Sequence, residues 1–212
     1  VADIIQMRDA GRYTSHPNSF NQERGKPSML YCSQAIKENG IKIITAPNGG
    51  FNDPDLNEEF IASGKTDMVA MARALIADPE YAVKLSEGRG KDVTPCVMCN
   101  ECHGTSSTKG PWLTFCAVNP KLGLPSSVRS ILPPFISKKV AVIGGGPGGM
   151  KAAITAAERG HKVTLFEKSD ALGGLQRHTD YCPLKWSFKD YKDFLIRQVE
   201  KAGIEVRLKT NA

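Results

Sequence analysis

The stretch Val140-Ala-Val-Ile-Gly-Gly-Gly-Pro-Gly-Gly149 decides the fold of the second half of the chain. Its apolar part predicts a buried strand over residues 138–143, and its glycines lead into an Ala-rich run that predicts a helix over 150–159. A second strand is predicted over 162–166, and Glu167 follows it directly. A strand, a glycine-rich turn, a helix and an acid after the next strand form the full context of a dinucleotide-binding unit.

Three glycines of this turn have a physical role in such a unit. Gly144 makes the turn, Gly146 lets a pyrophosphate reach the helix N-terminus, and Gly149 lets helix and strand pack closely. Glu167 is placed to bind a ribose hydroxyl. The alternative is a tight turn between strand and helix that binds nothing. The pattern as a whole favours the nucleotide site.

The chain continues from this unit in the same style. Leu172-Gly-Gly174 follows, and helical spacing of Phe188, Tyr191, Leu195 and Val199 predicts a helix over 187–202. A further strand is predicted over 205–208. The second half of the chain is therefore predicted to begin an α/β domain of the Rossmann type.

Four of the six cysteines lie before this domain, in Cys96-Val-Met-Cys99-Asn-Glu-Cys102 and in Cys116-Ala-Val-Asn-Pro120. The first three are three residues apart, which is too close for each to have its own disulfide partner. Thiolates so close together repel one another unless a positive group lies between them. Three ligands on one loop and a fourth from further along are typical of a cubane iron–sulfur cluster.

Two alternatives to the cluster stay open at this point. A structural zinc site usually takes its ligands from two separated pairs, which fits this spacing less well. The cysteines could also be unrelated buried or redox-active thiols. His103 beside the third cysteine is interpreted as a neighbour of the site rather than as a ligand.

The first 95 residues alternate between predicted strands and helices. Strands are predicted over 2–7, 41–45 and 67–71, and helices over 29–38, from Asp53-Pro54 to about Ser63, and from Asp78-Pro79 onward. This rhythm indicates parallel βα units, which occur both at the end of a (β/α)₈ barrel and in an open doubly wound sheet.

Two small motifs favour the barrel. Gly49-Gly50 follows the second strand and Ala72-Arg73 follows the third, where barrels place a phosphate site in the loops after their last two strands. Glycines let backbone N–H groups approach phosphate oxygens, and Arg supplies a fork of donors. Taken singly, the glycines could be only a turn and Arg73 only a surface charge.

The composition of the chain argues against several classes of protein. The chain has 212 residues, is 41% hydrophobic and 24% charged, and carries a formal net charge of +6. The basic residues are scattered among 22 acids, so no nucleic-acid site is predicted. No run is apolar enough for a membrane helix, and no signal peptide opens the chain. A cluster needs reduced thiols, so the cysteine motif predicts that the protein is located in the cytoplasm. The chain opens on Val1 and stops after a strand, so it is expected to be a fragment.

The motifs occur together in one known family. Asp67-Met-Val-Ala-Met-Ala-Arg73, Asp78-Pro79, the cysteine motifs and the glycine-rich stretch resemble the multidomain old yellow enzyme family. This family includes 2,4-dienoyl-CoA reductase, clostridial enoate reductase, bile-acid-inducible NADH:flavin oxidoreductases and trimethylamine dehydrogenase. The resemblance covers nearly the whole chain from Ile41 onward.

The resemblance implies three parts: residues 1–95 as the C-terminal part of an FMN-binding TIM barrel, 96–137 as an iron–sulfur segment and linker, and 138–212 as the N-terminal part of a Rossmann-like FAD/NAD(P)-binding domain. The implied metal ligands, for a [4Fe–4S] cluster, are Cys96, Cys99, Cys102 and Cys116. The expected cofactor-binding residues are Gly49, Gly50, Ala72 and Arg73 for FMN and Gly144, Gly146, Gly148, Gly149, Glu167, Gly174, Leu175 and Lys185 for FAD. The family's proton donor is expected before residue 1, so the catalytic residues are unknown.

The activity that the resemblance implies is that of an NAD(P)H-dependent ene-reductase. Electrons would pass from FAD through the cluster to FMN, and an activated C=C bond of an enoate, dienoyl-CoA or 3-oxo-steroid would be reduced. The expected partner is a small unsaturated molecule, and a homo-oligomer is compatible with the sequence. The fragment alone is expected to be inactive. The cysteine spacing departs from that of dienoyl-CoA reductase and is closer to that of the amine dehydrogenase, which is one alternative. A zinc-stapled nucleotide-binding module without redox role is the other.

Overall fold

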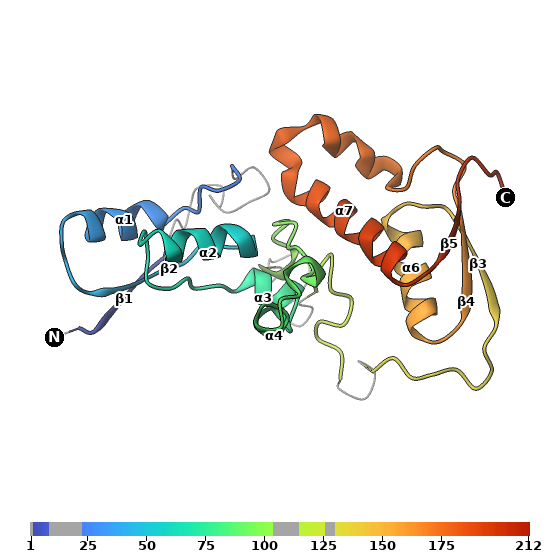
Figure 1. Cartoon of the computed structure of the whole chain (residues 1–212), viewed down its shortest axis with the longest axis horizontal. Coiled ribbons are helices and arrows are strands. Elements are labelled where there is room, and N and C mark those ends of the chain that lie inside the picture. The colour runs from blue at the N-terminus through green and yellow to red at the C-terminus, as the bar shows by residue number, and fades with distance from the viewer. Residues whose placement is uncertain (1, 9–22, 104–114, 126–129) are drawn as a thin grey trace. The chain divides into compact units, whose positions relative to one another are not determined.

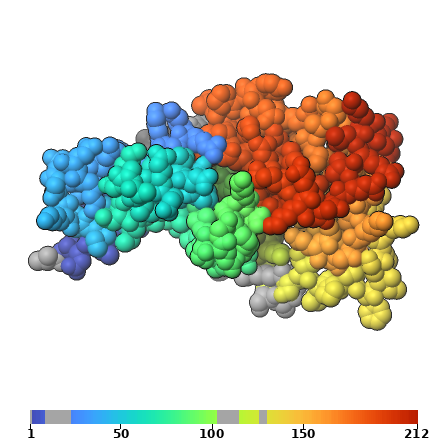
Figure 2. All heavy atoms as spheres, in the orientation of Figure 1, coloured from blue at the N-terminus to red at the C-terminus, as the bar shows by residue number. Residues whose placement is uncertain are grey.

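The computed structural model describes residues 2–8, 23–103, 115–125 and 130–212, which are the coloured parts of Figure 1 and Figure 2. The chain divides into two compact units, Val1–Leu122 and Gly123–Ala212. Each unit has its own parallel sheet. The prediction of an α/β fold with parallel sheets is therefore confirmed.

The sheet of the first unit is built from β1 (Ile4–Met7) and β2 (Ile44–Pro47), which pair in parallel. Helix α1 (Leu30–Glu38) connects them. Both strands and the helix were predicted from the sequence, with boundaries shifted by one to three residues. The shift at β2 is towards its C-terminal end, which brings the strand directly up to Asn48-Gly49-Gly50.

The prediction of a full strand over 67–71 is wrong. This segment does run beside β2, because Met68 N–H donates to Thr45 O at 3.3 Å and Asn48 and Ala70 form a single parallel bridge. At its start, however, the side chain of Asp67 accepts the Thr45 N–H at 2.7 Å, in the place of a backbone carbonyl. The ladder is therefore interrupted where the sequence alone predicts that it begins.

Helix α2 (Pro54–Ala62) begins as the Asp-Pro signal predicts. The Asp53 side chain accepts hydrogen bonds from the N–H groups of Asp55 and Leu56, and Pro54 occupies the first helical position. The helix packs on a small core of Leu30, Phe51 and Phe60, in which the two phenylalanine rings meet edge to face at 6.3 Å.

The second Asp-Pro signal does not start a helix at Asp78. Instead Asp78 ends the short helix α3 (Arg73–Ala77), and α4 (Tyr81–Ser86) begins two residues later than predicted. The Asp78 side chain accepts from Glu80 N–H at 3.0 Å but also from Lys84 and from Thr94 N–H. The bonds to Lys84 and Thr94 fix the position of Asp78. The Asp-Pro sequence signal contains no information about these contacts. Among the described residues of this unit, the 3₁₀ helices η1 (Gly90–Asp92) and η2 (Glu101–His103) follow α4.

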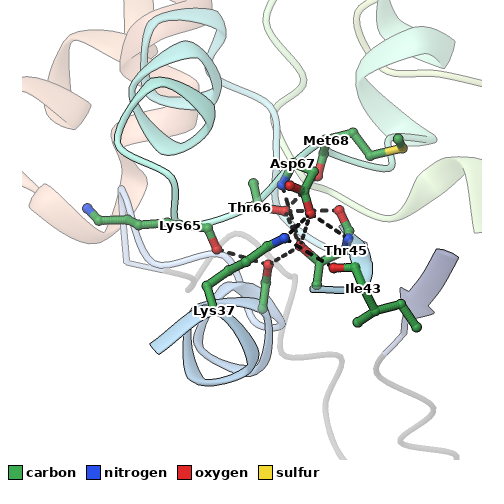
Figure 3. A network of polar contacts seen from close by, with 8 residues as sticks. Lys37, Ile43, Thr45, Lys65, Thr66, Asp67 and Met68 are labelled. Atoms are coloured by element: carbon green, nitrogen blue, oxygen red, sulfur yellow. Dashed lines mark hydrogen bonds and ion pairs between the residues drawn. The ribbon is translucent and has the colours of Figure 1, made fainter. Parts of the chain in front are cut away.

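A polar network at the start of β2 holds α1, β2 and the 66–71 segment together (Figure 3). Thr45 is fully buried, and its hydroxyl accepts from Ser33 Oγ at 2.7 Å and donates to Asp67 Oδ2 at 3.0 Å. Lys37 forms an ion pair with the same carboxylate and donates to Ile43 O at 3.1 Å. A hydrogen bond from Lys37, then one from Thr45 N–H, holds the pKa of Asp67 below its usual range.

This lowered pKa predicts a pH-dependent contribution to stability. The charged form of Asp67 is favoured in the folded state, so its contribution is present above the unfolded pKa and is lost as the pH falls through the folded value. Asp67→Asn should lower the free energy of unfolding at pH 7, because it removes the charge that Lys37 and Thr45 N–H stabilise. The expected loss is only about 1 kcal/mol, because the carboxylate is partly exposed. Thermal unfolding at pH 7 and pH 3 tests this: the difference from wild type should shrink at pH 3, and an equal difference at both would contradict it.

The second unit contains β3 (Lys139–Ile143), α6 (Pro147–Glu158), β4 (Lys162–Phe166), η3 (Gly174–Tyr181), η4 (Pro183–Lys185), α7 (Trp186–Lys201) and β5 (Glu205–Arg207). The strands are parallel in the order β3-β4-β5, with Val142 opposite Leu165 and Leu165 opposite Val206. Because strands in sequence order are joined by right-handed crossovers, α6 and α7 lie on the same side of the sheet and contact each other (Figure 1). Met150, Leu165, Leu195 and Val199 are fully buried between sheet and helices.

In the part of the chain that the structure describes, no helix has both the length and the apolar character that a membrane span requires.

Candidate functional site

The first candidate site lies where β2 and the segment beside it end. The bridge between Asn48 and Ala70 is the last pairing of the two, and Gly49-Gly50 and Ala72-Arg73 follow it on either side. Gly49 and Gly50 have φ values of 118° and 86°, a backbone region that other residues rarely adopt. The structure therefore brings the four predicted residues to one edge of the sheet, as expected for loops after parallel strands.

Two buried polar groups beside this loop have no hydrogen-bond partner among the described residues. They are Ser28 Oγ and Asn52 Nδ2, and Asn52 is only 8% exposed. The backbone N–H groups of both residues donate to the glycine loop, to Gly49 O at 3.2 Å and to Gly50 O at 3.0 Å. Buried polar groups without a described partner, packed against a glycine loop, fit a site for a flavin phosphate. The sequence did not single out either residue.

Arg73 is the first residue of α3, and its Nη1 donates to Asn100 Oδ1 at 2.5 Å. Asn100 lies between the second and third cysteines, 27 residues further along the chain. The guanidinium has five donors in a planar fork, so it can contact more than one group. The role of Arg73 as a phosphate ligand remains a prediction, and the structure adds a contact with the cysteine loop.

The loop that carries three cysteines contains two residues whose backbone lies in the left-handed region. Met98 and Asn100 have φ values of 53° and 60°. Met98 is fully buried, and its N–H group donates to Cys96 Sγ at 3.4 Å. Backbone N–H groups directed at cysteine sulfur are among the features that tune iron–sulfur clusters.

The cysteines are near enough for their charges to interact. Burial raises the pKa of Cys96 to about 11, and the negative charges of Cys116 and Cys102 act in the same direction, whereas the Met98 N–H and Arg73 lower it. Burial also raises the pKa of Cys102, with further contributions from Cys116 and Cys99. Cysteine thiols that lie close enough to interact, two of them with a pKa raised by burial, fit the donor set of a metal centre.

Within the described residues, no three side chains of His, Cys, Asp or Glu converge closely enough to hold one metal ion. A cubane cluster does not require such convergence, because each of its four thiolates binds a different iron. The assignment of Cys96, Cys99, Cys102 and Cys116 as ligands therefore stays a prediction that the donor set fits.

The second candidate site is the glycine turn after β3. Gly144 has a φ of 99° and its N–H donates to Phe166 O at 2.8 Å, which links the ends of β3 and β4. A Cβ atom on Gly149 would lie 1.8 Å from Gly144 O, so only glycine fits at that position. Gly146 caps α6 without a side chain, which leaves the first N–H groups of the helix open to an anion.

Glu167 is 6% exposed, and both of its carboxylate oxygens accept hydrogen bonds. Oε1 accepts from Ser169 N at 2.8 Å and Ser169 Oγ at 2.7 Å, and Oε2 accepts from Gly145 N at 2.6 Å. The bonds from Ser169, followed by that from Gly145, hold the pKa of Glu167 below its usual range. Because Oε2 makes one such bond, it has a lone pair left for a ribose hydroxyl, so the residue fits the predicted role.

The double glycine of the predicted FAD site packs on the turn. Gly173 N–H donates to Gly145 O at 2.8 Å, and a Cβ atom on Gly174 would lie 3.0 Å from Gly146 Cα. Behind it, the stem of Lys192 fills the space beside Gly173, and its buried ammonium pairs with Asp180. The sequence did not predict these supporting contacts, nor the role of Ser169.

Leu175 and Lys185 make no described contact with the turn. Leu175 is 92% exposed on η3, and Lys185 ends η4. Gly148 belongs to the glycine-rich stretch itself and lies in the first turn of α6, where a Cβ atom would meet nothing within 4 Å. For these three residues the binding role stays a prediction.

Comparison with known families finds two matches on this chain. Residues 2–92 match the NADH:flavin oxidoreductase / NADH oxidase family, and residues 139–188 match the family of FAD dependent oxidoreductases. The matches fall in the first and the second unit, on either side of the cysteine segments.

Similar proteins include an NADH oxidase of Thermoanaerobacter brockii, which is 40% identical over 93% of this chain and 30% of its own length. A cinnamate reductase of Clostridium sporogenes is 42% identical over 76% of this chain and 24% of its own length. A dimethylamine dehydrogenase of a Hyphomicrobium species is 31% identical over 98% of this chain and 28% of its own length. The chain thus spans about a third or less of the curated relatives it matches.

Among solved structures, a complex of 2-naphthoyl-CoA reductase with 2-naphthoyl-CoA is similar to this chain with a TM-score of 0.79 and 33% sequence identity. The similarity covers 92% of this chain and 29% of the reductase.

Proposed function

The chain belongs to the old yellow enzyme family of flavin oxidoreductases, and from that premise we propose that it is part of an NAD(P)H-dependent ene-reductase. The substrate would carry an activated C=C bond, as in an enoate, a dienoyl-CoA or a 3-oxo-steroid. The observation that supports this most is the presence of two flavin-family matches on one chain, separated by four cysteines in cluster spacing. The names of the cinnamate reductase and the naphthoyl-CoA reductase support the choice of a reductase.

The proposed domain assignment follows the three predicted parts. Residues 1–95 would form the C-terminal part of an FMN-binding (β/α)₈ barrel, 96–137 the iron–sulfur segment and linker, and 138–212 the N-terminal part of a Rossmann-like domain for FAD and NAD(P)H. The parallel pairing of β1, β2 and the 66–71 segment supports the first, and the β3-β4-β5 order supports the last. The cysteine segments belong to the same compact unit as the barrel part.

The residues would divide the work as follows. When bound, FAD, the [4Fe–4S] cluster and FMN supply hydride acceptance, one-electron transfer and hydride delivery, in that order. Gly49, Gly50 and Arg73 would hold the FMN phosphate with backbone N–H groups and a charged fork. Glu167 and the open N-terminus of α6 would hold the ribose and pyrophosphate of FAD.

Arg73→Ala should weaken FMN binding in the full-length protein. The substitution removes a charge-assisted hydrogen bond worth roughly 1.5–3 kcal/mol, or about ten- to a hundredfold in affinity. FAD content should not change, because its proposed site is in the other unit. Flavin extraction and separate quantification of FMN and FAD measure both effects.

Arg89→Ala is the control for this substitution, since Arg89 belongs to the same unit and its ion pair with Glu87 is on the surface. FMN retained by Arg73→Ala at wild-type affinity would contradict the phosphate assignment. Loss of both flavins together would show that the substitution had acted on folding rather than on the phosphate.

The second candidate function is an amine dehydrogenase, which the similarity to dimethylamine dehydrogenase supports. The two functions differ in the direction of electron flow. Under anaerobic conditions, NADH should reduce the enzyme's flavins and an enoate such as cinnamate should reoxidise them if it is an ene-reductase. Reduction by dimethylamine and none by NADH or NADPH would instead favour the dehydrogenase and would overturn the first proposal.

A further inference from the structure

Helix α3 contacts both segments that carry the four cysteines. It has only five residues, Arg73–Ala77, but Ala74 and Ala77 are each 3% exposed and anchor it in the first unit. Ala74 packs with Tyr81 and Val93 in a small core. The helix therefore has a fixed position from which other segments can be held.

Asn100 ties the first cysteine segment to the beginning of α3. Its Oδ1 accepts the hydrogen bond from Arg73 Nη1 at 2.5 Å. Its φ of 60° lies in the left-handed region, which asparagine adopts more readily than most residues. Asn100 thus contributes its backbone to the turn between Cys99 and Cys102 and its side chain to the contact with the helix.

Asn119 ties the second cysteine segment to the end of the same helix. Its Nδ2 donates to Ile76 O at 2.8 Å, a carbonyl in the last turn, where helices leave acceptors without a partner. Its Oδ1 accepts from Lys121 N at 3.1 Å, which closes the turn after Cys116. The neighbouring Val118 is 4% exposed, so the segment is packed as well as hydrogen-bonded.

Asp78, directly after α3, fixes the chain just before the first cysteine. Its Oδ2 accepts from Thr94 N at 2.8 Å and from Lys84 Nζ at 2.6 Å. Asp78 is 3% exposed, and Thr94 is two residues before Cys96. The two cysteine segments are thus held to the helix and its C-cap residue at three separate points.

We propose that α3 sets the position of the two cysteine segments relative to each other, and that Asn100 and Asn119 are positioning residues for the iron–sulfur cluster. This inference rests on the proposed function, because it takes the four cysteines to be cluster ligands. Arg73, the proposed phosphate ligand, begins the same helix, so one short element would hold both the flavin phosphate and the cluster.

The first test is Asn119→Asp in the full-length protein, purified without oxygen. Aspartate keeps an oxygen acceptor for Lys121 N–H but does not donate to Ile76 O. We expect the visible absorbance of the cluster to bleach roughly tenfold faster than in wild type when an iron chelator is added. The EPR spectrum of the reduced cluster should also change, while FAD content stays the same.

The matched control is Asn39→Asp. Asn39 Nδ2 donates to Ala35 O at 2.8 Å at the end of α1, so the substitution removes the same kind of amide-to-carbonyl bond at a distance in sequence from the cysteines. This variant should bleach at the wild-type rate and keep the wild-type EPR spectrum.

A second pair of variants decides the inference should Asn119→Asp not fold. Asn100→Gly keeps the left-handed backbone but removes the acceptor for Arg73, whereas Asn100→Asp keeps that acceptor. The glycine variant should lose its cluster faster to the chelator, and the aspartate variant should stay near the wild-type rate. Equal rates for these two variants, both at the wild-type value, would count against the contact with Arg73.

The outcomes separate this inference from the function on which it rests. A wild-type protein without iron and sulfide would overturn the proposed function, and the positioning role with it. A wild-type protein that holds the cluster, beside Asn119→Asp and Asn100→Gly variants with unchanged bleaching and EPR spectra, would overturn the positioning role alone.

Discussion

Gly149→Ala should destabilise the second unit and abolish FAD binding, because the new methyl group would lie 1.8 Å from Gly144 O. Backbone cannot give way there without opening the contact between α6 and the end of β3. Overpacking of this kind costs roughly 3 kcal/mol, and the phosphate-binding turn would be displaced as well. Thermal unfolding and the FAD content of the purified full-length protein measure the two effects.

The matched control is Gly148→Ala, one residue earlier in the same turn of α6. A Cβ atom on Gly148 meets nothing within 4 Å, and alanine is the better helix former. We expect this variant to unfold at or above the wild-type temperature. A Gly149→Ala protein with wild-type stability and FAD content would contradict the close packing of turn and helix.

Cys99→Ser should remove one iron ligand and with it most of the cluster, since serine is a poor substitute for a thiolate at iron. Iron and sulfide content should fall, and flavin content should be retained because neither proposed flavin site includes Cys99. Cys182→Ser, at a cysteine outside the motif, should leave iron and sulfide unchanged. An unchanged iron content in Cys99→Ser would show that this residue is not a ligand.

The sequence predicted most strands and helices because their signals are local. The apolar run before the glycines, the Asp-Pro cap of α2 and the spacing in α7 each lie within a few residues. The predictions failed where a tertiary contact replaces a local one. The Asp67 carboxylate takes the Thr45 N–H in place of a strand carbonyl, and the contacts of Asp78 with Lys84 and Thr94 remove it from the start of α4.

In the candidate sites too, the sequence alone indicated the residues that belong to a local pattern and missed those that depend on tertiary contacts. Glycines with special backbone geometry and cysteines at cluster spacing have sequence patterns, so the sequence alone singles out Gly49, Gly144 and the cysteines as candidates. Supporting residues such as Asn100, Asn119 and Ser169 were missed, because an amide or hydroxyl gains its role only from what folding places beside it. The sole sequence signal for Asn119 was its place in the Cys116-Ala-Val-Asn-Pro120 motif.

The metal, sulfide and flavin content of the full-length protein purified without oxygen tests the proposed function most directly. We expect about four iron and about four acid-labile sulfide per chain, together with FMN and FAD in equal amounts, and a visible spectrum that bleaches when NADH or NADPH is added. A colourless protein that contains zinc and no iron, or one that contains a single kind of flavin and no sulfide, would contradict it.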